Sequence, residues 1–227
     1  MIPLRDDNPS QRAPVITRLV IIANVLAFMV ELSAGEARPE FLREWGVVPG
    51  RLFAAFTGET SLPVELMTVF TSMFLHGGWL HLIGNMWFLW IFGDNVEDAI
   101  GSPGYLGFYL AAGAVAAGFH AALMPGSPIP TVGASGAIAG VLGAYAQAFP
   151  HARVLTLVPI FFFFQVVAIP ALVLLGLWFL MQFLSASLSV GGASGGVAWW
   201  AHIAGFVFGF IAMAMFRRRR GRGFDDE

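Results

Sequence analysis

Four polar side chains of this sequence have the types that acyl transfer by a serine nucleophile requires. A serine hydroxyl becomes an effective nucleophile when a base such as histidine removes its proton, and Ser135 and His202 are the candidates for these roles. The tetrahedral oxyanion that forms next needs hydrogen-bond donors. Asn85 can donate from its amide, His81 from a ring nitrogen and Ser135 from its backbone N–H. These residue types predict a serine hydrolase with a Ser–His pair.

Other hydrolytic chemistries fit the sequence less well. The chain has no cysteine, which excludes thiolate metal sites, disulfides and a cysteine nucleophile. It also lacks the H-E-x-x-H zinc motif, and His76 and His81 would point about 140° apart on a helix. Asp94 and Asp98 lie together at one end of a predicted helix, so they do not form a facing aspartyl pair. We therefore expect no metal or cofactor, and a structural role for His76.

The composition indicates that the elements positioning these groups lie in lipid. Of the 227 residues, 57% are hydrophobic and only 11% are charged, with a mean hydropathy of +0.75. A soluble domain has about 45–50% apolar and about 25% charged residues. A membrane span needs about 20 apolar residues, and six such segments fill this length. The sequence therefore predicts an all-α, polytopic membrane protein with a single six-helix domain.

The domain is predicted over residues 15–216, with polar tails at 1–14 and 217–227. Its six predicted spans cover residues 15–32, 79–92, 105–123, 133–149, 169–184 and 197–216. A long loop follows the first span, and it is completed by an apolar segment at 65–74 that is too short to cross the membrane. This segment is predicted to be re-entrant or interfacial. The phenylalanine run at 161–164 is predicted to lie at the membrane interface before the fifth span.

The basic residues predict the orientation. All 12 are arginines, and the run at 217–220, followed by Arg222, directly adjoins the sixth span. Positively charged segments stay in the cytoplasm, so the C-terminus is expected there. Six spans then place the N-terminus in the cytoplasm too, in agreement with Arg5, Arg12 and Arg18. Because arginine-only basic usage is typical of GC-rich bacterial genomes, we expect a multi-pass protein of the bacterial plasma membrane.

This orientation places the polar candidates at one depth. The second, fourth and sixth predicted spans all run from the outside to the inside. His81 and Asn85, Ser135, and His202 lie within the first two turns of these spans, roughly 3–10 Å below the outer boundary. Polar side chains inside spans are costly and usually functional. The sequence therefore predicts one shared site in the outer leaflet.

Small residues predict that the fourth and sixth spans pack closely. They recur every four positions, at Gly136, Gly140 and Ala144 in the fourth span and at Ala201, Gly205 and Gly209 in the sixth. Such faces let helix backbones approach one another in lipid. His202 lies on much the same face as Gly205, so this packing would carry His202 toward the fourth span and Ser135.

Three motifs of the chain resemble the signatures of the rhomboid intramembrane serine proteases. They are His81-Leu-Ile-Gly-Asn85, Gly133-Ala-Ser-Gly136 and Ala201-His202-Ile-Ala-Gly205, and their order and spacing match over almost the whole chain. The resemblance implies a catalytic dyad of Ser135 and His202, oxyanion-side positions at His81 and Asn85, and supporting glycines at Gly133, Gly136 and Gly205. It also implies a lateral, partly embedded first loop and a fifth span that acts as a gate for substrates.

Two features depart from the family pattern. Some rhomboid relatives have an aromatic residue one turn after the serine, which stacks on the histidine, whereas this chain has Ala139. The first loop also lacks the Trp-Arg pair of some relatives. Neither departure removes a catalytic group, but the orientation of His202 must then depend on other contacts.

The predicted function is hydrolysis of transmembrane proteins near the outer leaflet. The expected partners are transmembrane substrates and the lipid bilayer, with no nucleic acid, and the sequence does not specify an oligomeric state. A catalytically silent rhomboid-like binding protein or chaperone is the alternative, although such relatives usually lack the serine or the histidine. A small transporter is disfavoured because the sequence has neither an inverted repeat nor an intramembrane ion pair.

Overall fold

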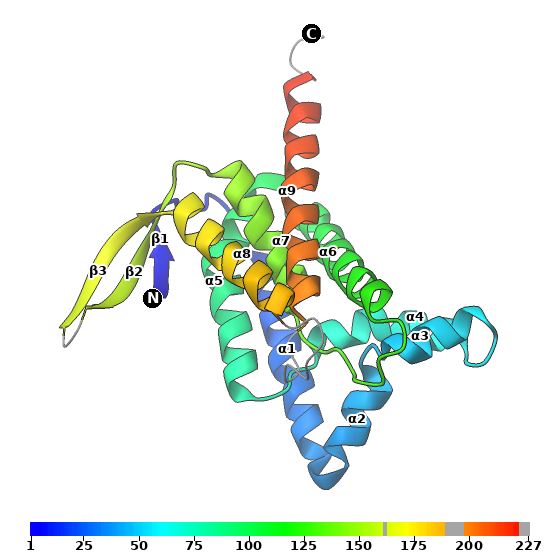
Figure 1. Cartoon of the computed structure of the whole chain (residues 1–227). Helices are drawn as coiled ribbons and strands as arrows, with labels where there is room; N and C mark the ends of the chain where they lie inside the picture. Colours follow the sequence, from blue (N-terminus) through cyan, green and yellow to red (C-terminus); the bar gives the residue numbers. More distant parts are fainter. Residues whose placement is uncertain (161–162, 189–197, 223–227) are drawn as a thin grey trace.

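The structure is a computed structural model that describes residues 1–160, 163–188 and 198–222. Its elements in chain order are β1 (Ile2–Asp6), α1 (Val15–Ser33), η1 (Gly35–Ala37), α2 (Arg38–Trp45), α3 (Pro49–Phe56), α4 (Leu62–Thr71), η2 (Ser72–Phe74), α5 (Trp79–Ile100), α6 (Ser102–Leu123), α7 (Ser135–Ala148), β2 (Arg153–Ile160), β3 (Phe163–Pro170), α8 (Ala171–Leu188) and α9 (Trp199–Arg222). Most of the chain is therefore helical (Figure 1).

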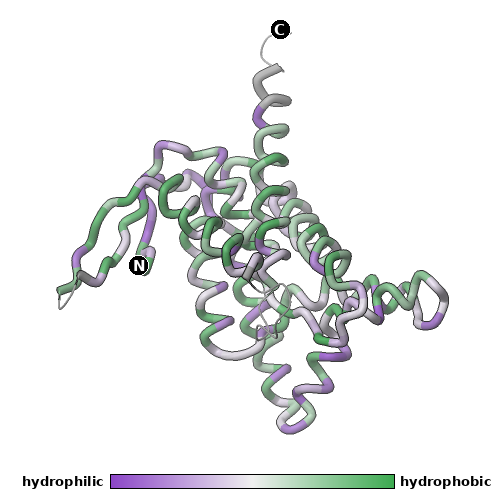
Figure 2. The backbone as a smooth tube through the Cα atoms, in the orientation of Figure 1, coloured by the Kyte–Doolittle hydropathy of each residue, from purple (hydrophilic) through white to green (hydrophobic). Residues whose placement is uncertain are grey.

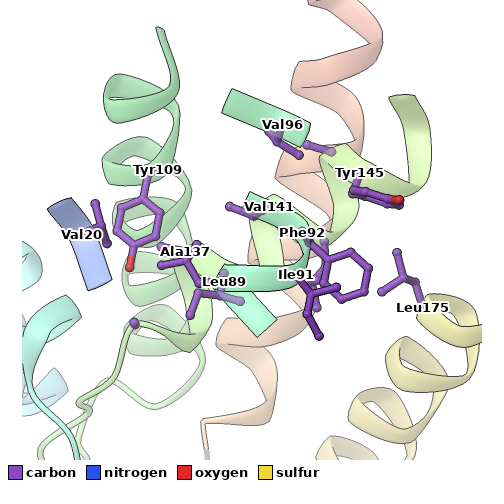
Figure 3. Close-up of a cluster of buried hydrophobic side chains, with 14 of the residues drawn as sticks. Val20, Leu89, Ile91, Phe92, Val96, Tyr109, Ala137, Val141, Tyr145 and Leu175 are labelled. Atoms are coloured by element: carbon purple, nitrogen blue, oxygen red, sulfur yellow. The ribbon is translucent and has the colours of Figure 1, made fainter. Parts of the chain in front are cut away.

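Helix α7 lies at the centre of the bundle. Every residue from Gly136 to Ala146 is buried, because α5, α6, α8 and α9 all pack against α7. A helix that is covered all round has no polar stripe, and α7 is accordingly built of small and apolar residues. Figure 3 shows part of this core, in which Tyr109 of α6, Phe92 of α5 and Tyr145 of α7 lie among aliphatic side chains.

The outer surface of the bundle is suited to lipid. Large apolar side chains are exposed on several helices, including Leu26, Leu80, Met181 and Ile211. Hydrophobic residues occur along much of the length of the bundle helices (Figure 2). Helices α1, α6 and α9 are long and apolar enough to cross a membrane. The chain is thus a multi-pass membrane protein.

The last helical segment of the first loop and the second predicted span are separated by a sharp bend. The segments 62–74 and 79–100 together pass the same test for a span, but they are bent by 81° at the break between them. Helix α7 has only 14 residues and is about 21 Å long, which is less than the thickness of the hydrocarbon core. Length and apolarity alone thus select fewer than six spans, and the six-span arrangement stays a prediction.

The all-α class predicted from the sequence needs a correction. Strands β1, β2 and β3 form an antiparallel sheet in that order, and β2 and β3 pair from Arg153 opposite Pro170 to Ile160 opposite Phe163. β1 comes from the predicted N-terminal tail, and β3 contains the second half of the phenylalanine run, whose first two residues lie outside the described ranges. From the sequence, this run is predicted to lie at the membrane interface and no strand is predicted, because a short apolar run does not by itself distinguish a strand from a helical segment.

Glu97 near the end of α5 fixes the starts of two other helices. Its carboxylate accepts hydrogen bonds from the backbone N–H of Ile16 (2.9 Å) and of Thr17 (2.8 Å) at the start of α1. It also accepts one from the hydroxyl of Ser102 (2.6 Å), the first residue of α6. A carboxylate satisfies the unpaired N–H groups of a helix start and interacts favourably with the helix dipole. The Glu97 side chain thus fixes the position of α5 relative to α1 and α6. It thereby helps to position the face of α5 that carries His81 and Asn85.

Candidate active site

The backbones of α7 and α9 come into close contact through glycines. A Cβ atom at Gly205 would overlap the carbonyl oxygen of Gly136, and a Cβ atom at Gly209 would overlap that of Gly140. These are the faces that the four-residue spacing of small residues predicts. Because no side chain separates the two helices, a residue near the start of α9 can reach the start of α7.

Ser135 and His202 meet at this contact. Ser135 is the first residue of α7, and His202 lies in the first turn of α9. The Nε2 atom of His202 lies 2.8 Å from the Oγ atom of Ser135, and the imidazole is only 9% exposed. This distance is within the range over which a histidine accepts the proton of a serine nucleophile.

A fourth helix contributes a group that the sequence analysis missed. The Oε1 atom of Gln182, on α8, lies 2.7 Å from Nδ1 of His202, and Gln182 is only 7% exposed. The polar layer therefore includes four helices and not three. A lone amide in a largely apolar helix is a signal that could have revealed Gln182, because such groups are costly in a span.

Two aromatic rings, one on α8 and one at the start of α9 itself, enclose His202. The ring of Trp178, one turn before Gln182 on α8, has its centroid 6.0 Å from that of the imidazole, at an interplanar angle of 36°. Trp199 approaches the imidazole edge-on, with centroids 6.1 Å apart. These contacts surround the histidine in the absence of the aromatic residue that some relatives have at the position of Ala139.

Hydrogen-bond donors line the same cavity as Ser135. The Nδ1 atom of His81 accepts a hydrogen bond from the backbone N–H of Gly77 at 3.3 Å, so the ring proton of neutral His81 lies on Nε2. The Nδ2 atom of Asn85 is buried and has no hydrogen-bond partner among the described residues. The first N–H groups of α7, beginning with Ser135, have no acceptor within the helix. The site therefore offers side-chain and backbone donors, as oxyanion binding requires.

These groups line a cavity of about 570 Å³. Its polar lining residues include His81, Asn85, Ser135, Gln182 and His202, and most of the remaining wall is apolar. Both α5 and α8 contribute to the wall, so the cavity lies between the helix with the oxyanion-side candidates and the helix with Gln182. A mostly apolar cavity with a few convergent polar groups is the usual form of a binding site.

His76 lies beside this site without lining the cavity. It is fully buried, its backbone N–H donates to the carboxylate of Glu31 at 2.9 Å, and its carbonyl accepts from Arg38 at 2.9 Å. Arg38 also forms an ion pair with Glu31 at 2.6 Å. These bonds join α1, α2 and the segment before α5, and His76 itself lies against His81, with ring centroids 5.1 Å apart.

No metal-binding group is apparent in the part of the chain that the structure describes. Within residues 1–160, 163–188 and 198–222, no three His, Asp or Glu side chains are close enough to share a metal ion. The polar side chains that line the cavity include a hydroxyl, imidazoles and amides.

Gly133 supplies a backbone conformation that this site needs. Its φ is +131°, and a Cβ atom there would lie 2.8 Å from the Nε2 atom of His81. We expect Gly133→Ala to strain the backbone and displace His81, and so to slow covalent labelling of Ser135 by a fluorophosphonate at least about tenfold. The matched control is Gly126→Ala, where no atom lies within 4 Å of the added carbon. Equal labelling rates in the two variants would contradict this role.

Comparison with known proteins identifies the family of the chain. The family model for the rhomboid domain matches residues 63–219. The chain is 36% identical over 132 residues to the rhomboid protease GluP of Bacillus subtilis, which covers 58% of this chain and 24% of GluP. It is 30% identical over 148 residues to the mitochondrial presenilin-associated rhomboid-like protein A of Danio rerio, covering 63% of this chain and 39% of that protein. The chain thus spans about a quarter to two fifths of the length of these relatives.

Proposed function

Because the chain belongs to the rhomboid family, whose members act on membrane proteins within the bilayer, we propose that it is an intramembrane serine endopeptidase. Ser135 is the nucleophile and His202 is its general base. The observation that carries this proposal is the distance of 2.8 Å between His202 Nε2 and Ser135 Oγ, inside a cavity with several hydrogen-bond donors.

The reaction proceeds in two steps. His202 Nε2 accepts the hydroxyl proton of Ser135 as Oγ bonds to the carbonyl carbon of the substrate, and the carbonyl oxygen takes up the negative charge. His202 then gives its proton to the leaving amine as the C–N bond breaks, which leaves an acyl-enzyme ester. In the second step His202 takes a proton from water, the water oxygen attacks the ester, and Ser135 is released with its proton restored.

The oxyanion of both steps is held by donors on two helices. Asn85 Nδ2 and His81 Nε2–H lie on α5, and the N–H groups at the start of α7 belong to the nucleophile's own helix. Since Asn85 Nδ2 is buried without a partner among the described residues, an oxyanion in the cavity would satisfy it. The positive end of the α7 dipole also favours negative charge at this point.

The substrate is a transmembrane segment that enters from the lipid between α5 and α8. Both helices line the cavity, and both expose apolar side chains to lipid, among them Leu80 and Met181. A helical substrate has its carbonyls engaged in i→i−4 hydrogen bonds, so it must unwind locally before Ser135 can attack. We expect small residues at the cleavage site and helix-breaking residues nearby.

The proposed topology follows the distribution of arginine. Six spans within residues 15–216 place the tails 1–14 and 217–227 in the cytoplasm and Ser135 near the outer leaflet of a bacterial plasma membrane. The described part of this arginine cluster includes Arg217, whose guanidinium donates to the carbonyl of Gln147 at 3.2 Å. A catalytically silent rhomboid-like binding protein is the alternative, and the hydrogen-bonded pair of Ser135 and His202 favours the enzyme.

Covalent labelling tests the proposal directly. Purified protein in detergent should react with a fluorescent fluorophosphonate, and Ser135→Ala should abolish the label while the melting temperature is retained. Ser33→Ala, which removes an exposed hydroxyl at the end of α1, is the matched control and should label like the wild type. Label that persists in Ser135→Ala, or wild-type protein that does not react and does not cleave a single-span substrate in proteoliposomes, would exclude the proposed activity.

A further inference from the structure

Gln182 is a buried amide with a specific partner. It lies on α8, a helix whose neighbouring side chains are largely apolar, and only 7% of its surface is exposed. Placing an amide in a nonpolar environment without a hydrogen bond is energetically costly. Its Oε1 atom forms such a hydrogen bond with the Nδ1 atom of His202, at a distance of 2.7 Å. The contact is with the imidazole of the site itself and not with a structural group elsewhere.

The chemistry of this contact determines where the imidazole carries its proton. An amide oxygen can only accept a hydrogen bond, so the proton of a neutral His202 lies on Nδ1. Nε2 then has a free lone pair directed at the hydroxyl of Ser135, 2.8 Å away. In the opposite tautomer, Nε2–H would donate to Ser135 and could not take its proton. The tautomer therefore decides whether the pair can react.

We propose that Gln182 is a positioning residue that holds His202 in the tautomer and orientation required to activate Ser135. The inference rests on the proposed protease function and assigns to Gln182 the part that an acidic residue has in serine triads. Unlike a carboxylate, the neutral amide fixes the ring without adding a negative charge to the cavity.

Because Gln182 lies on α8, the orientation of the base His202 depends on the position of this helix. Ser135 is on α7 and His202 on α9, but both Gln182 and the neighbouring Trp178 ring belong to α8. The opposite face of α8 exposes Leu177, Met181 and Leu184. A displacement of α8 that widened the opening toward α5 would therefore release the imidazole as well. The imidazole of His202 therefore has the tautomer and orientation that activate Ser135 when α8 is packed against α9.

Two substitutions test the hydrogen bond. Gln182→Met keeps the length of the side chain but removes the acceptor, and it should slow fluorophosphonate labelling of Ser135 about 10- to 100-fold. Gln182→Glu keeps the acceptor and adds a charge that stabilises the imidazolium. It should retain labelling at pH 8, and the acidic limb of its pH–rate profile should move to higher pH by about one unit or more. Gln165→Met, at an exposed position on β3, is the matched control and should change neither quantity.

The labelling rate of the folded protein separates positioning from packing. A purely structural role for Gln182 predicts that Gln182→Met loses thermal stability and that the fraction which remains folded labels at the wild-type rate. The inference is overturned if Gln182→Met labels at the wild-type rate, or if the profile of Gln182→Glu coincides with that of the wild type.

An independent measurement distinguishes failure of this inference from failure of the proposed function. The chain has five histidines, so nitrogen NMR of ¹⁵N-histidine-labelled protein can assign His202 by comparison with His202→Gln. In Ser135→Ala, which has no activity to measure, His202 should still carry its proton on Nδ1, and Gln182→Met added to that background should abolish this preference. A proton on Nε2 in Ser135→Ala would overturn the inference even if the wild type is labelled. Wild type that is neither labelled nor able to cleave the single-span substrate, but has the proton on Nδ1, would instead refute the protease.

Discussion

Replacing Ser135 with alanine, His202 with alanine, or both together is expected to reduce the cleavage rate by the same large factor, about 10⁴-fold or more. The reason is that hydroxyl and imidazole act as one unit, joined by a hydrogen bond of 2.8 Å, so that either one alone contributes almost nothing. Initial rates on a single-span substrate in proteoliposomes measure the effect. What remains in the variants is the contribution of the oxyanion donors and of substrate binding.

The variant with both substitutions shows whether Ser135 and His202 act together or independently. If the losses of the two single variants multiplied, each residue would act separately, and the assignment of His202 as the base of Ser135 would be wrong. His151→Ala is the matched control, because His151 is exposed in the turn after α7, and it should keep the wild-type rate.

The second large effect is expected at the contact between α7 and α9. Gly209→Ala places a carbon against the carbonyl oxygen of Gly140 and 2.8 Å from its Cα, and both are backbone atoms that cannot rotate away. The helices must separate, at a cost of about 1–3 kcal/mol in stability. Ser135 and His202 lie on these same two helices, so we also expect labelling to fall at least about 100-fold. Thermal melting and labelling, measured on the same preparation, report the two effects.

A glycine elsewhere in the bundle supplies the control for this experiment. Gly118 lies in α6, and a Cβ atom there would have no atom within 4 Å. Gly118→Ala should be neutral or slightly stabilising, since alanine is the better helix former by about 1 kcal/mol. If Gly118→Ala and Gly209→Ala melted and reacted alike, the glycine contact would not be what holds the site together.

Several features of the protein could be read from the sequence because they depend on local composition. Apolar length predicts α1 over nearly the observed range, since each span must cross the hydrocarbon by itself. The small residues of α7 and α9 indicate a close helix contact, because only a residue without a large side chain permits it. The prediction of a rhomboid protein, based on three motifs, is confirmed by the family match.

Other features became visible only in three dimensions. The sheet of β1, β2 and β3 joins the N-terminal segment to a hairpin more than a hundred residues away, whereas the sequence predicts only a polar tail and an interfacial phenylalanine run in these places. The carboxylate of Glu97 serves two helix starts, one of them far away in sequence. Pairings of this kind depend on which surfaces meet, and the identity of either residue alone does not specify its partner.

The lipid environment explains why some features could be predicted from the sequence and others could not. In a soluble protein, the alternation of polar and apolar residues shows which face of a helix points inward. Here the lipid-facing and buried faces are both apolar, so the sequence of α8 shows an apolar helix but not the direction in which it packs. The sequence therefore predicted a candidate nucleophile, a candidate base and candidate donors as residue types in a common layer. Only the packing of α8 against α9 brought Gln182 to 2.7 Å from His202 and completed the site.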